Sequence, residues 1–252
     1  MLDLIVRENK PLNAQYSLII LTSNEKLPEM LPGQFAEIRV DNAPNTFLRR
    51  PISINFVDYT KNELWLLIQK VGEGTHKLCA LNNGDSLNLL FPLGNSFSFP
   101  NKTNASVLLV GGGVGIAPLL FWGSVLFNKG FKCSFLLGGR SKDNLLQLDE
   151  FEKFGTVLTT TEDGSMGERG FVTQHSVLSA PNFDFIYSCG PTPMMKAVAA
   201  YAASNNVSCE VSLENTMACG FGACLCCVTD TVEGHICVCT DGPVFNIKKL
   251  KW

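Results

Sequence analysis

The chain has little excess charge and few histidines. Lysine and arginine number 20 against 23 aspartate and glutamate, which gives its 252 residues a formal net charge of -3 at pH 7. Without a basic excess the surface has no general attraction for a phosphate backbone, so nucleic acid is not expected as a partner. The three histidines, His76, His175 and His235, show no metal-ligand spacing. No catalytic triad and no paired-carboxylate site can be recognised either.

Signals for export or membrane insertion are also lacking. The N-terminal residues, MLDLIVRENKPL, contain early acids and no cationic start before an apolar run, unlike a signal peptide. Residues 105–127 carry no charge and are long enough to span a bilayer. However, five glycines and a proline interrupt them, and SVLLV suits a buried parallel strand, with a helix only after Pro118. We therefore expect a cytoplasmic protein without a membrane span.

The rhythm of apolar residues changes near residue 100. Before it, six short apolar or alternating runs are separated by turn residues, as in an antiparallel barrel or sandwich. After residue 105, five buried runs alternate with segments that suit helices, such as 144–154 and 192–205, which predicts a parallel sheet with crossover helices. The sequence predicts a multidomain α+β protein: an antiparallel β-barrel domain (1–100), an α/β domain (101–214) and a cysteine-rich lobe (215–252).

Ten cysteines are present, and six of them lie within the 21 residues 219–239. In a reducing compartment such clustering is more often a metal site than a set of disulfides. Three of these cysteines have the ligand spacing of plant-type [2Fe-2S] proteins, which also need a fourth cysteine further along. They are Cys219, Cys224 and Cys227.

Cys237 and Cys239 both offer the fourth ligand. Gly220 and Gly222 would let the backbone wrap closely around a cluster, because no side chain obstructs its N–H groups. A tetrahedral zinc site and a metal-free thiol loop are the alternatives, although zinc sites more often have paired CxxC spacing.

A glycine-rich turn, GGGVGIAP (111–118), follows an expected strand and precedes an expected helix. Such a turn presents N–H groups to a pyrophosphate, but it can also serve close packing alone. CGPTPM (189–194) follows the fourth strand of the same sheet, and ligands of open parallel sheets bind outside the carboxyl ends of strands. The two loops should therefore face one crevice. The candidate cofactor-binding residues of the turn are Gly111, Gly112, Gly113 and Gly115.

Two further residues, which follow the second expected strand of the parallel sheet, are candidates to contact a nucleotide in this crevice. Arg140 and Ser141 could contact an adenosine ribose or its 2′-phosphate, and Arg140 could equally be a solvated surface residue. Cys189, in the CGP loop, is a candidate neighbour of a nicotinamide or a buried structural cysteine.

The barrel half contains two possible phosphate seats. In RPISI (50–54), Arg50 can neutralise a phosphate and Ser53 can hydrogen-bond a ring nitrogen. In GEGTHKL (72–78), Gly74 and Thr75 lie at an expected helix start, with Thr75 as a candidate N-cap. Two phosphate seats in one barrel suggest a dinucleotide.

Taken in order, several motifs resemble the ferredoxin-NADP reductase superfamily. They are LRRPISI, VGEGTHKL, GDSLNLLFPLGNSF, LLVGGGVGIAPL, CGPTPMM, and ENTMACGFGACLCCV through VCTDGPVF. More closely, they resemble the electron-transfer subunits of bacterial type B dihydroorotate dehydrogenases, over almost the whole chain. The resemblance implies an FAD-binding barrel, an NAD-binding α/β domain, a [2Fe-2S] lobe and a catalytic partner subunit that carries FMN, in a heterotetramer with two of each chain.

The resemblance also implies site residues at matching positions. The cluster ligands would be Cys219, Cys224, Cys227 and Cys239, which leaves Cys226 and Cys237 as non-ligand thiols. The flavin would contact Arg50, Pro51, Ile52, Ser53, Leu67, Ile68, Gln69, Gly74 and Thr75. Gln69 departs from the family pattern, where arginine is expected, and the interval of eleven residues between Cys227 and Cys239 is short.

The function implied is electron transfer in pyrimidine biosynthesis. Electrons would leave the partner's FMN, pass through the cluster to FAD, and reach NAD⁺. The alternatives are an NAD(P)H reductase subunit that serves a ferredoxin, hydrogenase or oxygenase, and a non-redox zinc-binding module.

Overall fold

The protein is described by a computed structural model over residues 1–179 and 182–252. It consists of two compact units. The barrel unit contains Met1–Ser96, Asn215–Thr229 and His235–Pro243, and the sheet unit contains Phe97–Glu214, Asp230–Gly234 and Val244–Trp252. Residues 215–252, which the sequence predicts as a separate lobe, therefore contribute to both units.

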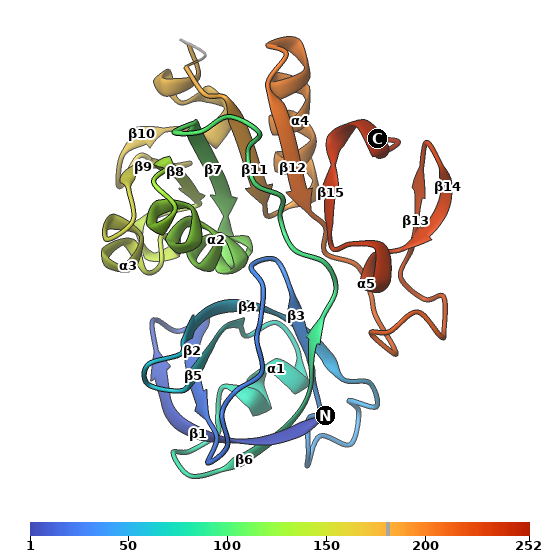
Figure 1. The fold of residues 1–252 in the computed structure, drawn as a ribbon. Helices are drawn as coiled ribbons and strands as arrows, with labels where there is room; N and C mark the ends of the chain where they lie inside the picture. Colours follow the sequence, from blue (N-terminus) through green and yellow to red (C-terminus); the bar gives the residue numbers. More distant parts are fainter. Residues whose placement is uncertain (180–181) are drawn as a thin grey trace. The chain divides into compact units, whose positions relative to one another are not determined.

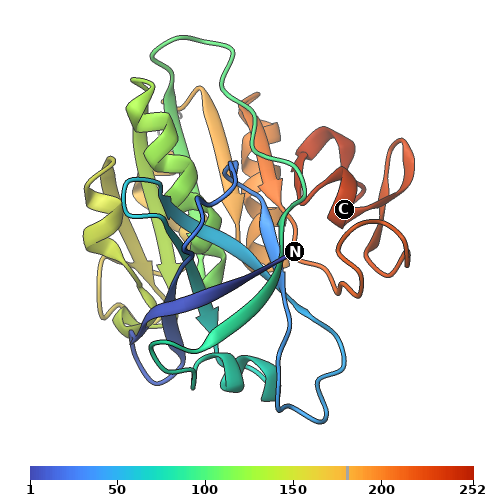
Figure 2. The same ribbon diagram turned by 60° about the horizontal axis from the view of Figure 1, so that its bottom comes forward.

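The barrel unit is built on six antiparallel strands that close into a barrel in the order β1-β2-β5-β4-β3-β6 (Figures 1 and 2). The strands are β1 (Leu2–Pro11), β2 (Tyr16–Thr22), β3 (Phe35–Ile38), β4 (Arg50–Asp58), β5 (Glu63–Gln69) and β6 (Ser86–Leu93). The short helix α1 (Glu73–Leu78) follows β5. The six predicted strands are confirmed, as a barrel rather than a sandwich.

Aliphatic side chains fill the barrel. Leu4, Ile19, Ile54 and Leu66 are each 0% exposed. Burying one such side chain stabilises a fold by roughly 1.5–3 kcal/mol. The closed barrel is therefore a firm support for the flavin motif, which begins at the first residue of β4.

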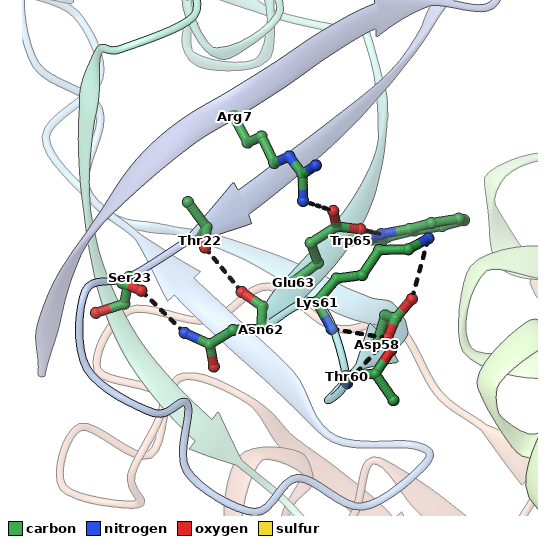
Figure 3. A network of polar contacts seen from close by, with 9 residues as sticks. All are labelled: Arg7, Thr22, Ser23, Asp58, Thr60, Lys61, Asn62, Glu63 and Trp65. Carbon is green, nitrogen blue, oxygen red and sulfur yellow. Dashed lines mark hydrogen bonds and ion pairs between the residues drawn. The ribbon is translucent and has the colours of Figure 1, made fainter.

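Polar contacts fasten the β4–β5 hairpin at the end away from that motif (Figure 3). The Asp58 carboxylate accepts hydrogen bonds from the backbone N–H groups of Thr60 and Lys61, at 3.0 and 3.1 Å. The buried Glu63 carboxylate pairs with Arg7 of β1 and accepts a 3.0 Å hydrogen bond from Nε1 of Trp65. These contacts hold the turn between β4 and β5 in place and so help to fix the register of the two strands.

The sheet unit contains a seven-stranded sheet in the order β10-β9-β8-β7-β11-β12-β15. All neighbours are parallel except β15, which runs antiparallel to β12. The bounds are β7 (Ser106–Gly112), β8 (Lys132–Gly139), β9 (Thr156–Thr161), β10 (Glu168–Arg169), β11 (Phe185–Cys189), β12 (Ser208–Ser212) and β15 (Val244–Asn246). The five predicted parallel strands are confirmed, and β10 and β15 are additions.

Residues 105–127 fold as the sequence predicts. They form β7, the 3-10 turn η1 (Gly113–Ile116) and the helix α2 (Ala117–Asn128). No helix among the described residues is long and apolar enough to cross a membrane.

One helix prediction is correct and another is wrong in extent. The predicted helix at 192–205 is α4 (Thr192–Ser204), which buries Met195, Val198, Ala199 and Ala202 on one face. The predicted helix over 144–154 is interrupted and consists of η2 (Lys142–Asn144) and α3 (Leu148–Glu152). Gln147 lies between them with φ of 55°, so its left-handed backbone breaks the helical hydrogen-bond ladder.

The remaining elements are short. Within the sheet unit they are η3 (Val172–Gln174), η4 (Ser176–Ser179) and η5 (Ile247–Lys249). Residues 215–252 also form β13 (Val228–Thr231), β14 (Gly234–Cys237) and α5 (Val238–Asp241), of which β13 and β14 pair as a two-stranded sheet.

Candidate functional site

The four predicted cluster cysteines all lie in the barrel unit, on a loop and on α5. Cys219 interacts with Cys224, whereas Cys227 interacts with Cys239 and also with Cys237. Within the described chain, no group of three or more histidine, cysteine, aspartate or glutamate side chains is gathered as one metal ion requires. A two-iron cluster takes two protein ligands on each iron, so two pairs of thiols suit it better than a single zinc ion.

Backbone N–H groups point at the paired sulfurs. Gly222 donates to Sγ of Cys239 at 3.2 Å, and Cys239 donates to Sγ of Cys227 at 3.4 Å. The N–H of Cys226 lies 3.5 Å from Sγ of Cys224. Such donors favour thiolates over thiols, but at Cys239 burial and the neighbouring Cys227 outweigh the Gly222 donor and raise the pKa to about 12.

Cys219 shows the same preference in its pKa. Burial acts to raise the pKa of this thiol, but hydrogen bonds from the N–H of Phe221 and from Cys224 outweigh burial and lower the pKa to about 6. Metal ligands must be deprotonated, so a thiol that ionises this readily suits ligation.

The two glycines of the cysteine loop are needed for close approach. Gly220 and Gly222 have φ of 77° and 86°, in the left-handed region. A Cβ on Gly220 would lie 2.6 Å from Cγ of Glu37 in β3, and a Cβ on Gly222 would lie 2.8 Å from Cγ2 of Thr240. The glycines thus let the loop lie directly on the barrel and on α5.

The two predicted non-ligand cysteines differ from each other. Cys226 is exposed, whereas Cys237 is buried. Burial and then the charge of Cys227 raise the pKa of Cys237. Its thiol interacts with Cys227, and the charge of Cys219 also acts on it.

A contact that sequence reasoning missed anchors the cysteine loop region on the barrel. The backbone N–H of Asn95 donates to the Gly242 carbonyl at 2.6 Å, and its side-chain amide donates to the Thr240 carbonyl at 2.8 Å. Gly94 has φ of 76°, and a Cβ there would lie 2.6 Å from Cδ of Pro243. The motifs PLGNSF and CTDGPVF, 145 residues apart at these positions, therefore contact each other directly.

The predicted flavin-phosphate seats lie together. A Cβ on Gly74 would lie 3.1 Å from Cδ of Arg50 and 2.9 Å from Cγ2 of Thr46. The half-exposed Arg50 side chain is thus beside the start of α1, where a phosphate can meet both a guanidinium and backbone N–H groups. Thr46 is a candidate contact that the sequence motifs did not indicate.

The prediction that Thr75 is the N-cap is wrong. Gly72 is the N-cap of α1, and Thr75 is its third helical residue. The Thr75 hydroxyl accepts hydrogen bonds from the N–H groups of Val71 and Gly72, at 2.9 and 3.1 Å. Thr75 is 9% exposed, so it shapes the turn from within.

The other predicted flavin residues divide by exposure. Pro51, Ile52 and Ser53 are half-exposed on β4, as residues that line a ligand site would be. Leu67 and Ile68 are 1% and 0% exposed, so they can offer a ligand only their backbone. Gln69, at the end of β5, is half-exposed.

The two predicted nucleotide loops meet in the sheet unit. Cys189, the last residue of β11, is the register partner of Gly111 in β7. A Cβ on Gly115 would lie 2.4 Å from Cα of Gly190, and a Cβ on Gly112 would lie 2.7 Å from Sδ of Met194. Gly113 has φ of 58°. The glycines therefore let the two loops close on one another at the carboxyl edge of the sheet.

Cys189 lies at this edge but is only 1% exposed. Burial raises the pKa of its thiol well above the ordinary range, and the Glu214 carboxylate raises it further. It is therefore a buried, neutral thiol at the carboxyl edge of the sheet.

Arg140 follows β8 and is exposed, with its carbonyl accepting a 3.2 Å hydrogen bond from the N–H of Asp163. Ser141 caps η2. Hydrogen bonds from Ser165 lower the pKa of Asp163, the residue whose N–H contacts the Arg140 carbonyl.

Comparison with known proteins agrees with this geometry. Residues 214–251 match the family model for the iron-sulfur cluster binding domain of dihydroorotate dehydrogenase B, and residues 109–200 match the oxidoreductase NAD-binding domain. The dihydroorotate dehydrogenase B (NAD(+)) electron transfer subunit of Shouchella clausii is 38% identical over 252 residues, which cover 98% of this chain and 96% of the relative. The chain belongs to this family of electron transfer subunits. The resemblance stated from the sequence is confirmed.

Other members and solved structures extend the match. The electron transfer subunit of Fusobacterium nucleatum is 40% identical over 85% of this chain and 84% of its own. A structure of NADH-dependent reduced ferredoxin-NADP oxidoreductase aligns with a TM-score of 0.88 and 31% identity, covering all of this chain and 90% of that one. The ferredoxin reductase of carbazole 1,9a-dioxygenase shares the fold, with a TM-score of 0.70 over 81% of this chain and 65% of that one, at 22% identity. The predicted fold class is confirmed.

Proposed function

We propose that the chain passes electrons from an FMN-carrying dihydroorotate dehydrogenase subunit through a [2Fe-2S] cluster and FAD to NAD⁺, in pyrimidine biosynthesis. The observation that carries this proposal is the convergence of paired cysteines and backbone N–H groups in a chain that matches the electron transfer subunits along its length. The reducing state that free thiols need supports a cytoplasmic location.

The cluster ligands in this proposal are Cys219, Cys224, Cys227 and Cys239. Cys219 with Cys224, and Cys227 with Cys239, would supply two thiolates to each iron, and the N–H groups of Gly222 and Cys239 would stabilise the ligand sulfurs. Cys226 and Cys237 are left as free thiols.

FAD is assigned to the barrel. Arg50 and the start of α1 would hold its phosphates, Ser53 would hydrogen-bond the ring, and Ile52 would lie against it. FAD when bound accepts electrons singly and releases a pair of them as a hydride. The protein's part is to hold this group rigidly, and the barrel core provides that support.

NAD is assigned to the crevice of the sheet unit. The N–H groups of the turn at Gly111, Gly112, Gly113 and Gly115 would receive the pyrophosphate, and Cys189 would lie behind the nicotinamide as a neutral wall residue. NAD(H) is preferred over NADP(H) in this proposal, because the matching relatives are named for NAD(+) and because Asp143 and Asp149, downstream of Arg140, add negative charge. Diaphorase assays check this: a higher kcat/KM with NADPH would reverse the assignment.

The partner in this proposal is the FMN-carrying catalytic subunit, in a heterotetramer of two copies of each chain. The iron-loaded, flavin-loaded chain should reduce artificial acceptors with NADH and should oxidise no dihydroorotate alone. Adding the FMN subunit should produce NAD⁺-dependent oxidation of dihydroorotate. Turnover by this chain alone, or the absence of a native complex, would contradict the proposal.

A second candidate function is an NADH-dependent reductase subunit for another electron acceptor. The 31% identity to the NADH-dependent reduced ferredoxin-NADP oxidoreductase supports this second candidate. This alternative would be favoured if the chain reduced a ferredoxin with NADH faster than it supported dihydroorotate oxidation together with the FMN subunit.

A further inference from the structure

The barrel unit contains a buried carboxyl group, that of Glu37, whose burial is not explained by any hydrogen bond within the described residues. Glu37 in β3 is 0% exposed. Neither of its carboxyl oxygens has a hydrogen-bond partner among the described residues. Leaving a buried polar group unsatisfied costs about 1–3 kcal/mol, and more for a charged group. A residue with this cost is expected to serve something besides packing.

The surroundings of Glu37 are charged in an unusual way. Burial raises the pKa of its carboxyl to about 7, against the lowering effect of Arg50 and then Arg49. Arg49 donates to the backbone carbonyl of Glu37 at 3.2 Å, and also to the carbonyl of Asn88 at 3.1 Å. The charge of Cys219 acts on Glu37 in the opposite sense to the arginines.

Glu37 is adjacent to residues of both proposed cofactor sites of the barrel unit. Gly220 of the cysteine loop rests on it, with a constructed Cβ 2.6 Å from Cγ and 3.2 Å from Oε1. The charge of Arg50, the proposed phosphate residue of the flavin motif, acts on the Glu37 carboxyl. Pro51, next to Arg50, is the register partner of Glu37 across β3 and β4. One side chain thus contacts the cluster loop and faces the flavin motif.

We propose that Glu37 tunes electron transfer: its carboxylate lies under the cluster loop and lowers the reduction potential of the cluster. This inference rests on the proposed function. A negative charge in a low-dielectric interior disfavours each electron added nearby, because little water screens it. Glu37 itself gains and loses no electron. A more negative cluster potential makes the reduced cluster a stronger electron donor.

The test compares Glu37→Gln, which keeps the size and removes the charge, with Glu8→Gln on the exposed face of β1. Iron, FAD and the cluster midpoint potential are measured on the isolated chain, by EPR-monitored redox titration in mildly alkaline buffer. We expect Glu37→Gln to retain iron and FAD and to shift the cluster potential to a more positive value, whereas Glu8→Gln leaves it unchanged. An unchanged potential in Glu37→Gln would overturn the inference.

Glu37→Asp serves as the second variant, because it keeps the charge. It should hold the potential near that of the natural chain. Loss of iron from both Glu37 variants would show a purely structural role and would also overturn the inference. A natural chain that binds no [2Fe-2S] cluster would defeat the proposed function, whereas a normal cluster with no shift in Glu37→Gln would defeat only the role of Glu37.

Discussion

The side-chain amide of Asn95 donates to the carbonyl oxygen of Thr240 at 2.8 Å, one residue after the proposed ligand Cys239. The last carbonyls of a helix lack intrahelical partners, and Asn95 supplies donors to this end of α5 from the barrel. The position of Cys239 is therefore set partly by a residue that follows β6.

Asn95→Ala should weaken retention of the cluster. Losing one exposed hydrogen bond costs about 0.5–1.5 kcal/mol, so we expect iron to be released to a chelator roughly 2- to 10-fold faster, with FAD content unchanged. The visible absorbance of the cluster follows this loss. Asn101→Ala, at an exposed position further along the chain, is the matched control. If both variants released iron at the same rate, Asn95 would have no role in holding the cluster.

Serine substitutions separate ligands from bystanders. Cys226→Ser and Cys237→Ser should each keep about two irons per chain, as this type of cluster contains, and Cys239→Ser should lose them. Iron and labile sulfide analysis gives the answer directly. Iron loss in Cys237→Ser combined with retention in Cys239→Ser would exchange the two assignments.

Alkylation of the iron-loaded chain should be selective. Cys226 is exposed and free in our assignment, so iodoacetamide should modify it first. Burial raises the pKa of Cys133 and of Cys209 to about 12, which leaves almost no reactive thiolate. Peptide mass spectrometry under native conditions measures the order. Fast modification of Cys224 in the loaded chain would contradict its role as a ligand.

Gly115→Ala should impair the nucleotide crevice. Its Cβ would lie 2.4 Å from Cα of Gly190, so the two loops must move apart. Overpacking of this kind costs about 1–3 kcal/mol. We expect the KM for NADH to rise about 10-fold in diaphorase assays, while FAD and iron contents stay at the natural level. An unchanged KM would show that the close approach of the loops is not needed for binding.

Glu210 should make the stability of the sheet unit depend on pH. Burial raises the pKa of Glu210, although hydrogen bonds from Ser98 oppose this. The folded state therefore holds the proton more tightly than the unfolded state, so the free energy of unfolding falls as pH rises from the ordinary glutamate range through the raised pKa. Glu210→Gln should lack this fall. Urea unfolding across that range measures it, and parallel pH profiles for both chains would refute the prediction.

Most of the fold follows from local sequence, and the contacts that complete the site do not. The buried runs of β7 and β11 are short and bounded by glycine, so their assignment needs no tertiary information. Spacing predicts Cys219, Cys224 and Cys227 as cluster ligands, whereas the choice of Cys239 over Cys237 comes only from the resemblance. Thr75 was misassigned because the N-cap is defined by backbone angles that the sequence does not display.

The unpredicted features depend on partners far apart in the chain. Asn95 and Thr240 are separated by 145 residues, and no periodic pattern connects them. Glu37 in QFAEIRV reads as a residue on the solvent face of an alternating strand. In the structure all four residues of β3 are buried, because the cysteine loop rests on the face that would otherwise meet water.

The antiparallel pairing of β15 with β12 gives the C-terminal residues a protective function as well. In the described sheet β15 occupies the outer position next to β12, so it covers main-chain donors and acceptors that would otherwise invite pairing with another molecule. A fragment that ended at Glu214 would keep the five central strands and expose that edge of β12. Such a fragment would therefore be prone to pair with another molecule along the exposed edge of β12.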